Sequence, residues 1–369
     1  MVAFGAVDDW LAAPEDPRNL AEYAQAQGWS DGLPGIPPTR ERIEEVLQRW
    51  DLDPEDGLGP IAPAEGEATY ARIAANAVYA GADPDLFPLL ITALQALLAP
   101  EFNLDGVQAT THPVAPLVIV HGAAVDDLGF NAGAGMFGPG TKANATLGRA
   151  VRLCLLNIGG ARPGDRDRAT QGQPSKYTYC IGENAAESPW PLLHEHRLGL
   201  AAERSAVTVF GGENPHNVND HVSTVARGIL ETTASTMANL GANTAHYSQG
   251  EIFFVLSPEH AQTVAHSGFS RRDVQLYLFE RARLTVETLA KGGMHGMDAW
   301  MPWKRVVADD AGTRLPPLND PDDLHVLIAG GAGKHSSVIQ GFGASRSVTR
   351  EVDPRFTWDV TATSEEDGT

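Results

Sequence analysis

The sequence predicts an α/β fold in which a parallel or mixed sheet is flanked by helices. Short runs of Val, Ile, Leu and Phe, typical of buried strands, alternate with longer segments whose apolar residues recur at helical spacing. The sequence also contains a weak internal similarity, an echo of one segment in another. The apolar runs after Thr111 and after Ala245 each follow a histidine and precede a Gly-Phe pair. The echo suggests two related α/β halves around a cleft.

We divide the 369 residues into three parts. We expect 1–40 to form an irregular N-terminal arm and 353–369 to form a mobile C-terminal tail. The α/β catalytic region then spans 41–352, with halves at 41–210 and 211–352. A chain of this length has room for one large domain or two modest ones.

The first third of the chain carries mainly helix signals. Thr39 is a good N-cap after two prolines, Gly81 ends an Ala-rich segment, and Asp83 precedes a proline at a first helical position. The run from Val114 is rich in Val and Ile, which favours a strand covered on both faces. We therefore expect helices at 20–27, 40–50, 67–80 and 84–99, and a strand at 114–120.

Strands and helices alternate more regularly after residue 140. A helix is predicted at 141–157, and a long helix capped by Asn219 or Asp220 is predicted to reach about Ala238. Ser257 and Ser270 each begin a further helix. The predicted strands are 177–181, 206–210, 252–256 and 326–329.

The composition restricts the classes of partner. The formal net charge is −20, so nucleic acid and anionic membranes are poor partners. Two cysteines form no disulfide framework, the N-terminus lacks the pattern of a signal peptide, and no apolar run reaches membrane-spanning length. We therefore expect a cytoplasmic protein that binds a small molecule, and we expect it to form a homo-oligomer.

The glycine-rich segment 138–150, GPGTKANATLGRA, is a candidate anion-binding loop. Glycines allow close approach of backbone N–H groups, and the following helix start favours negative charge. Lys142, Asn144 and Thr146 cluster on the first turn, with Arg149 one turn further along. These four residues are the predicted substrate-binding residues here. The alternative is a plain glycine-rich turn.

The next polar segment joins three arginines in 162–168 to a strand that contains Cys180. Nearby cations could lower the pKa of this thiol and make it a nucleophile, and strand alternation places it on a polar face. Cys154 falls on the apolar face of its helix, so we expect an inert buried thiol there. Glu183, and Glu187 beyond it, are candidate acid–base groups. The alternative is a half-buried cysteine beside solvent-exposed arginines.

The segment 211–221, GGENPHNVNDH, follows a strand and is predicted to open a helix. A helix N-terminus disfavours imidazolium, so His216 and His221 are candidate catalytic residues or metal ligands. Asn217 and Asn219 would add substrate contacts. The alternative is that the asparagines cap the helix and that the histidines make structural hydrogen bonds.

Further loop histidines extend this prediction. His112 and His246 could complete a divalent metal site with the histidines of 211–221, although the spacing matches no established zinc motif. Lys334 and His335 follow the last strand and could receive a second anionic group of the substrate.

Several segments resemble an uncharacterised bacterial family, over about residues 25–352. They are GWSDGLPGIPPTRERIEEVL, PEFNLDGVQATTHP, PGTKANATLGRAVRLCLLNIGG, QPSKYTYCIGEN with ESPW, PHNVNDH, and GGAGKHSS with SRSVTR. In relatives, this region precedes or accompanies a redox domain with a UGSC or CGSC motif, containing selenocysteine or cysteine. The present chain contains no CGSC. The resemblance therefore implies either a redox partner on a separate polypeptide or a different chemistry.

Three functions are compatible with these patterns. The first is an enzyme that performs redox chemistry or reductive bond cleavage on a small polar or anionic metabolite, with a separate thiol or selenol protein. The second is a metal-dependent lyase or hydrolase that uses the histidines. The third is a small-molecule-binding subunit without catalysis.

Overall fold

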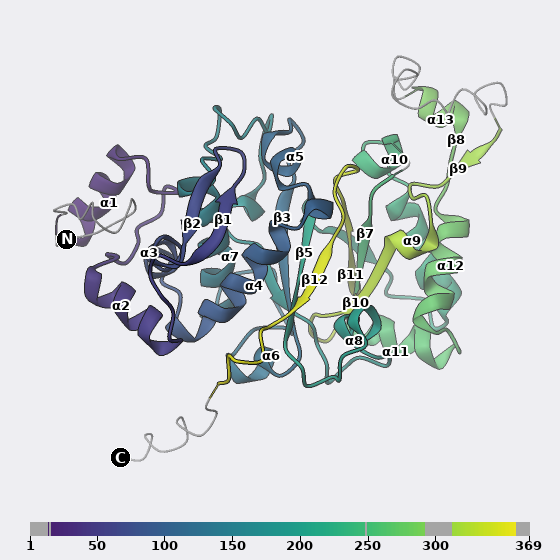
Figure 1. The fold of residues 1–369 in the computed structure, drawn as a ribbon. Coiled ribbons are helices and arrows are strands. Elements are labelled where there is room, and N and C mark those ends of the chain that lie inside the picture. Colours follow the sequence, from purple (N-terminus) through teal and green to yellow (C-terminus); the bar gives the residue numbers. More distant parts are fainter. Residues whose placement is uncertain (1–13, 15, 248, 292–311, 359–369) are drawn as a thin grey trace.

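The computed structural model describes residues 14, 16–247, 249–291 and 312–358 (Figure 1). Two sheets pack face to face at the centre of the protein, and helices cover the outer face of each sheet. The N-terminal helices cover one sheet, and the helices of the later part of the chain cover the other. The predicted α/β fold with mixed sheets and flanking helices is confirmed.

The first sheet has the order β12-β5-β3-β4. Its strands are β3 (Ala115–His121), β4 (Cys180–Gly182), β5 (Ala206–Gly212) and β12 (Val348–Glu351). β3 pairs parallel with β4 and antiparallel with β5, and β12 pairs antiparallel with the other edge of β5. Helices α3 (Tyr70–Ala80), α4 (Phe87–Leu97) and α7 (Lys142–Asn157) cover its outer side.

The second sheet has the order β10-β7-β11-β6, and its strand directions match those of the first sheet taken from β4 to β12. Its strands are β6 (His216–Asn219), β7 (Ile252–Leu256), β10 (Leu324–Ile328) and β11 (His335–Gln340). Helices α9 (Ala226–Met237), α11 (Pro258–His266) and α12 (Arg271–Arg281) cover its outer side.

The two sheets exchange their last strands. β6 follows β5 along the chain but pairs with β11, whereas β12 follows β11 but pairs with β5. The ends of β5 and β11 meet at a bridge between Gly212 and Gly341. The exchange joins the first and second parts of the chain, because each sheet is completed by a strand from the other part.

An apolar layer lies between the sheets. Alternate residues of β3 point to opposite sides: Leu117 belongs to the layer between the sheets, whereas Val118 packs against the helices. The ring centroids of Phe210 and Phe253 are 4.5 Å apart in this layer, and both side chains are buried. Full burial of such a ring contributes about 1.5–3 kcal/mol to folding.

The remaining elements are shorter. They are α1 (Pro17–Ala26), α2 (Arg40–Arg49), β1 (Gly57–Ile61), β2 (Gly66–Thr69), α5 (Leu104–Ala109), α6 (Ala124–Asp127), α8 (Leu193–Leu198), α10 (Asn243–Tyr247), β8 (Leu284–Thr285), α13 (Val286–Lys291) and β9 (Arg314–Leu315). The side chain of Thr39 accepts from the backbone N–H of Arg42, as predicted for the cap of α2. α8 packs against β5, β10 and β12.

Four predicted element starts are wrong. The helix expected at 20–27 begins at Pro17, where Asp16 caps it. The helix expected at 67–80 begins at Tyr70, because 57–69 form the β1–β2 hairpin. The strand expected at 177–181 begins at Cys180, after a 3-10 turn at Pro174–Lys176. Asn219 and Asp220 cap no helix: Asn219 ends β6, and α9 begins only at Ala226.

The start of the predicted C-terminal tail packs on the protein. Phe356 is buried, and its ring contacts the ring of Trp50 edge-on. The indole N–H of Trp358 donates to the carbonyl oxygen of Asp85 at 2.9 Å. Residues 359–369 lie outside the described part of the chain.

Among the described residues, no single helix is both long and apolar enough to cross a membrane. One pair, Pro84–Leu97 with Pro100–Ala109, meets the criteria of length and composition jointly, but it is bent by 70°. Nearly all residues of α4 in this pair are buried inside the protein.

Candidate functional site

A charged hollow of about 750 Å³ lies beside α7 and the loop that leads to β4. Its polar lining includes Ser30, Asp31, Arg152, Asp167, Gln173 and Lys176. The volume falls within the usual range for small-molecule sites. The hollow is therefore large enough for a compact metabolite, and its charged lining indicates a polar one.

Asp167 is shared by two cations at the wall of the charged hollow. Lys176 Nζ donates to the two carboxylate oxygens at 2.8 and 2.7 Å, and Arg152 Nη2 donates to Oδ2 at 3.0 Å. Nearby, Arg149 forms a two-pronged ion pair with Asp31 at 2.7 and 2.9 Å. Arg149 does not line the hollow, but it pairs with Asp31, so Arg152 and Lys176 share Asp167 alone. The three cations and two carboxylates of this group carry one positive charge in excess.

Burial perturbs the acid–base properties of this group. Burial lowers the pKa of Lys176, and Asp167 partly opposes that shift. Burial also lowers the pKa of Arg152. For Asp167, burial acts to raise the pKa, but the hydrogen bond and charge of Lys176 hold it below its ordinary value. The carboxylate therefore stays ionised, and the lysine releases its proton more readily than a lysine in water.

Polar atoms remain without protein partners at this wall. Gln173 donates through Nε2 to the carbonyl oxygens of Pro113 and Gly212, but its buried Oε1 has no hydrogen-bond partner. Among the described residues, Arg152 makes hydrogen bonds through Nη2 alone. Its other N–H groups can therefore contact the acceptor groups of a ligand. The Gln173 oxygen is buried beside the hollow, so a small shift of the side chain would bring it to a donor group of the ligand.

Local structure explains why these side chains meet. Arg152 lies on α7, which approaches β4 closely at Gly148: a Cβ there would lie 2.4 Å from Thr178 Oγ1 and 2.7 Å from the backbone nitrogen of Tyr179. The loop before β4 folds back through a hydrogen bond from the N–H of Gly164, at φ +79°, to the carbonyl oxygen of Asp167. Asp167 is thereby placed opposite Arg152.

The four residues predicted at the start of α7 do not gather around one ligand position. Lys142 is exposed and lies 3.5 Å from Asp83, and Thr146 donates to the carbonyl oxygen of its own helix at Lys142. Asn144 is buried and ties the backbone of Asn131 to that of Cys180. Arg149 alone contacts a lining residue of the charged hollow, Asp31, although it does not line the hollow itself.

Both cysteines are buried in the core between the first sheet and its helices. The predicted polar environment of Cys180 is wrong, because the strand begins at Cys180 and not at Tyr177, so the assumed alternation does not apply. Burial raises the pKa of both thiols. A raised pKa and the lack of exposure are the opposite of what an activated nucleophile needs.

We expect a thiol reagent to label both Cys180 and Cys154 of the native protein much more slowly than an exposed thiol, because burial keeps each thiol protonated and shielded. Labelling monitored by mass spectrometry should accelerate for both residues only in denaturant. Fast modification of Cys180 in the native state would contradict its placement in the core.

Part of the predicted histidine site is assembled on the second sheet. His221 Nε2 lies 3.0 Å from His335 Nε2, and His335 Nδ1 lies 2.9 Å from Asn217 Oδ1. Lys334 Nζ donates to the carbonyl oxygen of His221 at 3.4 Å. His335 is exposed at the rim of a glycine-lined hollow of about 330 Å³, formed by loops 133–138 and 329–333.

Among the described residues, His112, His216 and His221 of the predicted metal site form no metal-ligand group. His216 is exposed on β6 opposite Val338, and His112 Nε2 is held by Glu213 at 2.8 Å. The side chain of His246 lies outside the described residues. Within the described chain, the group with metal-ligand spacing is instead His121, Glu183 and His194. Of these, only Glu183 was a predicted acid–base residue.

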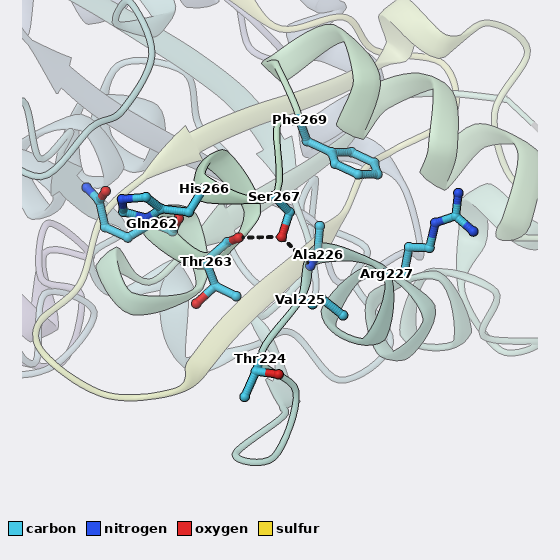
Figure 2. A pocket seen from close by; sticks show the side chains of 9 residues that line it. All are labelled: Thr224, Val225, Ala226, Arg227, Gln262, Thr263, His266, Ser267 and Phe269. Atoms are coloured by element: carbon cyan, nitrogen blue, oxygen red, sulfur yellow. Dashed lines mark hydrogen bonds between the residues drawn. The ribbon is translucent and has the colours of Figure 1, made fainter.

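Another hollow, between the start of α9 and the end of α11, has few free polar groups (Figure 2). Ser267 Oγ donates to the carbonyl oxygen of Thr263 at 2.9 Å and accepts from the N–H of Ala226 at 2.9 Å. Arg227 points away from Ser267 in this view. These bonds join two helix ends. The lining contains Arg227 but no carboxylate, so this hollow lacks a carboxylate shared between cations like Asp167 beside α7.

The chain matches no known family model, and no curated protein is similar to it at a significant level. The resemblance to the family with UGSC or CGSC relatives stays a prediction. Several residues were not predicted as site residues from the sequence. In the charged hollow they are Asp31, Arg152, Asp167, Gln173 and Lys176, and in the group with metal-ligand spacing they are His121 and His194. A signal was present: basic and acidic residues alternate in 162–168, and Lys176 follows closely.

Proposed function

We propose that the protein binds a compact anionic metabolite in the charged hollow and acts on it with Lys176 as the acid–base group. The observation that supports this most strongly is the sharing of one carboxylate, Asp167, between the cations of Arg152 and Lys176. A ligand carboxylate or phosphate would supply the missing negative charge. Charge-assisted hydrogen bonds of this kind are the strong ones in proteins.

The ligand should also carry a hydrogen-bond donor. The buried Oε1 of Gln173 has no partner, and an unsatisfied buried acceptor costs about 1–3 kcal/mol. A ligand hydroxyl or ammonium group would satisfy it. We therefore propose a hydroxylated or aminated carboxylate, or a small phosphate ester, as the substrate class.

Lys176 is the group in the hollow best suited to move a proton. Its pKa is lowered by burial, which brings it closer to the working range of a general base. The predicted redox chemistry with a separate thiol or selenol protein receives less support, because the thiol of Cys180 lies in the core. The exposed pair of His221 and His335 lies on the second sheet, and neither residue lines the charged hollow.

A panel of probe anions tests the proposal. Orthophosphate, a sugar phosphate, and short carboxylates with and without a hydroxyl group would be titrated against the native protein by calorimetry and thermal unfolding. Occupancy at about a hundredfold excess over Kd should stabilise the fold by about 2.7 kcal/mol. We expect the hydroxylated members to bind more tightly than their unsubstituted counterparts. Absence of binding by every class would overturn the proposal.

A further inference from the structure

A second polar group, the buried triad of His121, Glu183 and His194, lies apart from the charged hollow. His121 ends β3, Glu183 directly follows β4, and His194 lies on α8. Their relative exposures are 0%, 1% and 0%. One potential ligand atom from each residue lies within 4.8 Å of the other two. Three ionisable side chains are therefore concentrated in the interior, where unpaired charges are costly.

The hydrogen bonds of the buried triad leave one nitrogen unused. His194 Nε2 lies 3.3 Å from the carbonyl oxygen of Ala201, which can only accept, so this nitrogen carries the proton. The other nitrogen, Nδ1, then presents a lone pair, is buried, and has no hydrogen-bond partner. A neutral imidazole with a free lone pair is the form that binds a metal ion.

The surroundings of His121 also suit a ligand. Its Nδ1 lies 2.6 Å from Glu183 Oε2, and its Nε2 lies 2.7 Å from Thr208 Oγ1. Thr208 Oγ1 is in turn 2.8 Å from Thr349 Oγ1. If Nε2–H donates to Thr208 and Thr208 donates onward to Thr349, Nδ1 is left as a lone-pair donor. Hydrogen bonding of the remote ring nitrogen is what orients histidine ligands in metal sites.

We propose that the buried triad binds a first-row divalent cation such as Zn²⁺. Two imidazoles and a carboxylate are typical ligands of zinc, and the carboxylate can bind through one or both oxygens. The cation would replace the proton now shared between His121 Nδ1 and Glu183 Oε2. These atoms would then separate by several tenths of an ångström, because ligands at about 2.0–2.2 Å from zinc lie farther apart than a hydrogen-bonded pair.

The proposed role is structural. The triad has almost no exposure, so a substrate has no route to the ion without rearrangement. The ion would fasten α8 to β3 and to the end of β4. Since α8 also packs against β10 and β12, it would stabilise the region where the two sheets exchange strands.

A metal-free alternative is clear. Arg271 is buried, its Nε and Nη2 have no partner, and the charge of Glu183 acts on it. Without a metal ion, Glu183 would be balanced by Arg271 and by a proton on His121. This alternative predicts a hydrogen-bonded network that no cation stabilises.

Elemental analysis of the full chain, purified without a histidine tag, distinguishes a metal-bound triad from a metal-free hydrogen-bonded network. We expect an equimolar first-row metal, its loss on dialysis against a chelator with a fall in Tm of several degrees, and recovery of Tm with ZnCl₂. Replacement by Co²⁺ should give the visible absorption of a low-coordinate ion. A metal-free wild-type protein whose Tm is unchanged by zinc and by cobalt would overturn the proposal.

Variants then locate the ion. His194→Gln and Glu183→Gln should lose the metal, whereas His216→Gln and Glu187→Gln change exposed residues of the same types and should retain it. If the first pair does not fold, the cobalt spectrum of the wild-type protein still decides whether nitrogen and oxygen ligands surround the ion. Retention of metal by folded His194→Gln would place the ion elsewhere and contradict the proposal.

Discussion

Lys176→Met should weaken binding of the best probe anion by roughly tenfold to a hundredfold, the range expected for one hydrogen bond to a charged group. The methionine keeps much of the side-chain volume but removes one of the two positive charges that share the single carboxylate of Asp167. Affinity of the wild-type protein should also fall as pH rises, and at a lower pH than an exposed lysine would give, because burial lowers the pKa of Lys176. Calorimetry at several pH values measures both effects.

Lys142→Met is the matched control for this experiment. Lys142 lies in the same stretch of sequence but is exposed, with a surface ion pair to Asp83. Its removal should leave the affinity unchanged within a factor of about two, because surface ion pairs contribute about 0–1 kcal/mol. Equal losses in the two variants would indicate a general charge effect and not a site at Asp167.

Glu251→Gln should lower the free energy of unfolding at neutral pH by about 3 kcal/mol, the upper end of the scale for hydrogen bonds to a charged group. Glu251 is buried just before β7 and accepts from the N–H of Ser347 at 2.6 Å, and His325 Nε2 lies 3.1 Å from it. These contacts hold the segment that crosses from β11 to β12. Replacement by the neutral amide leaves His325 and Ser347 without the charge that they face.

The pH dependence gives this prediction a second readout. Burial acts to raise the pKa of Glu251, but His325 and Ser347 lower it from 4.5 to about 2. Because the folded-state pKa is the lower one, the stabilisation is present above pH 4.5 and is lost as pH falls toward about 2. Urea unfolding between pH 7 and 2 should therefore show a smaller acid-dependent loss in Glu251→Gln. If the free energy of unfolding changed with pH in the same way for the variant and the wild type, the role of this carboxylate would be contradicted.

The layer structure of the fold could be predicted from local patterns. The runs at β3, β5 and β7 are continuous and apolar because each strand is covered by helices on one side and by the other sheet on the opposite side. The exchange of β6 and β12 could not be predicted in this way. Both strands are short, and their pairing depends on contacts between distant parts of the chain.

The candidate site could also be predicted only in part, because it joins residues from distant parts of the chain. The polar loop at 162–176 was identified from composition, but its chemistry depends on Asp31 and Arg152, which belong to distant or helical segments. Arg152 falls within an apolar helix, where its sequence position gives no indication of a buried ion pair with Asp167. The prediction for Cys180 failed because the assumed strand alternation does not extend through the 3-10 turn and the residues before Cys180, and Cys180 packs in the core.

A crystal structure with the tightest-binding probe anion tests the central proposal most directly. We predict that its carboxylate or phosphate oxygens lie within hydrogen-bond distance of Lys176 Nζ and a free N–H of Arg152, and that its hydroxyl or ammonium group donates to Gln173 Oε1. An anion bound instead beside His221 and His335, with the charged hollow unchanged, would contradict the proposal.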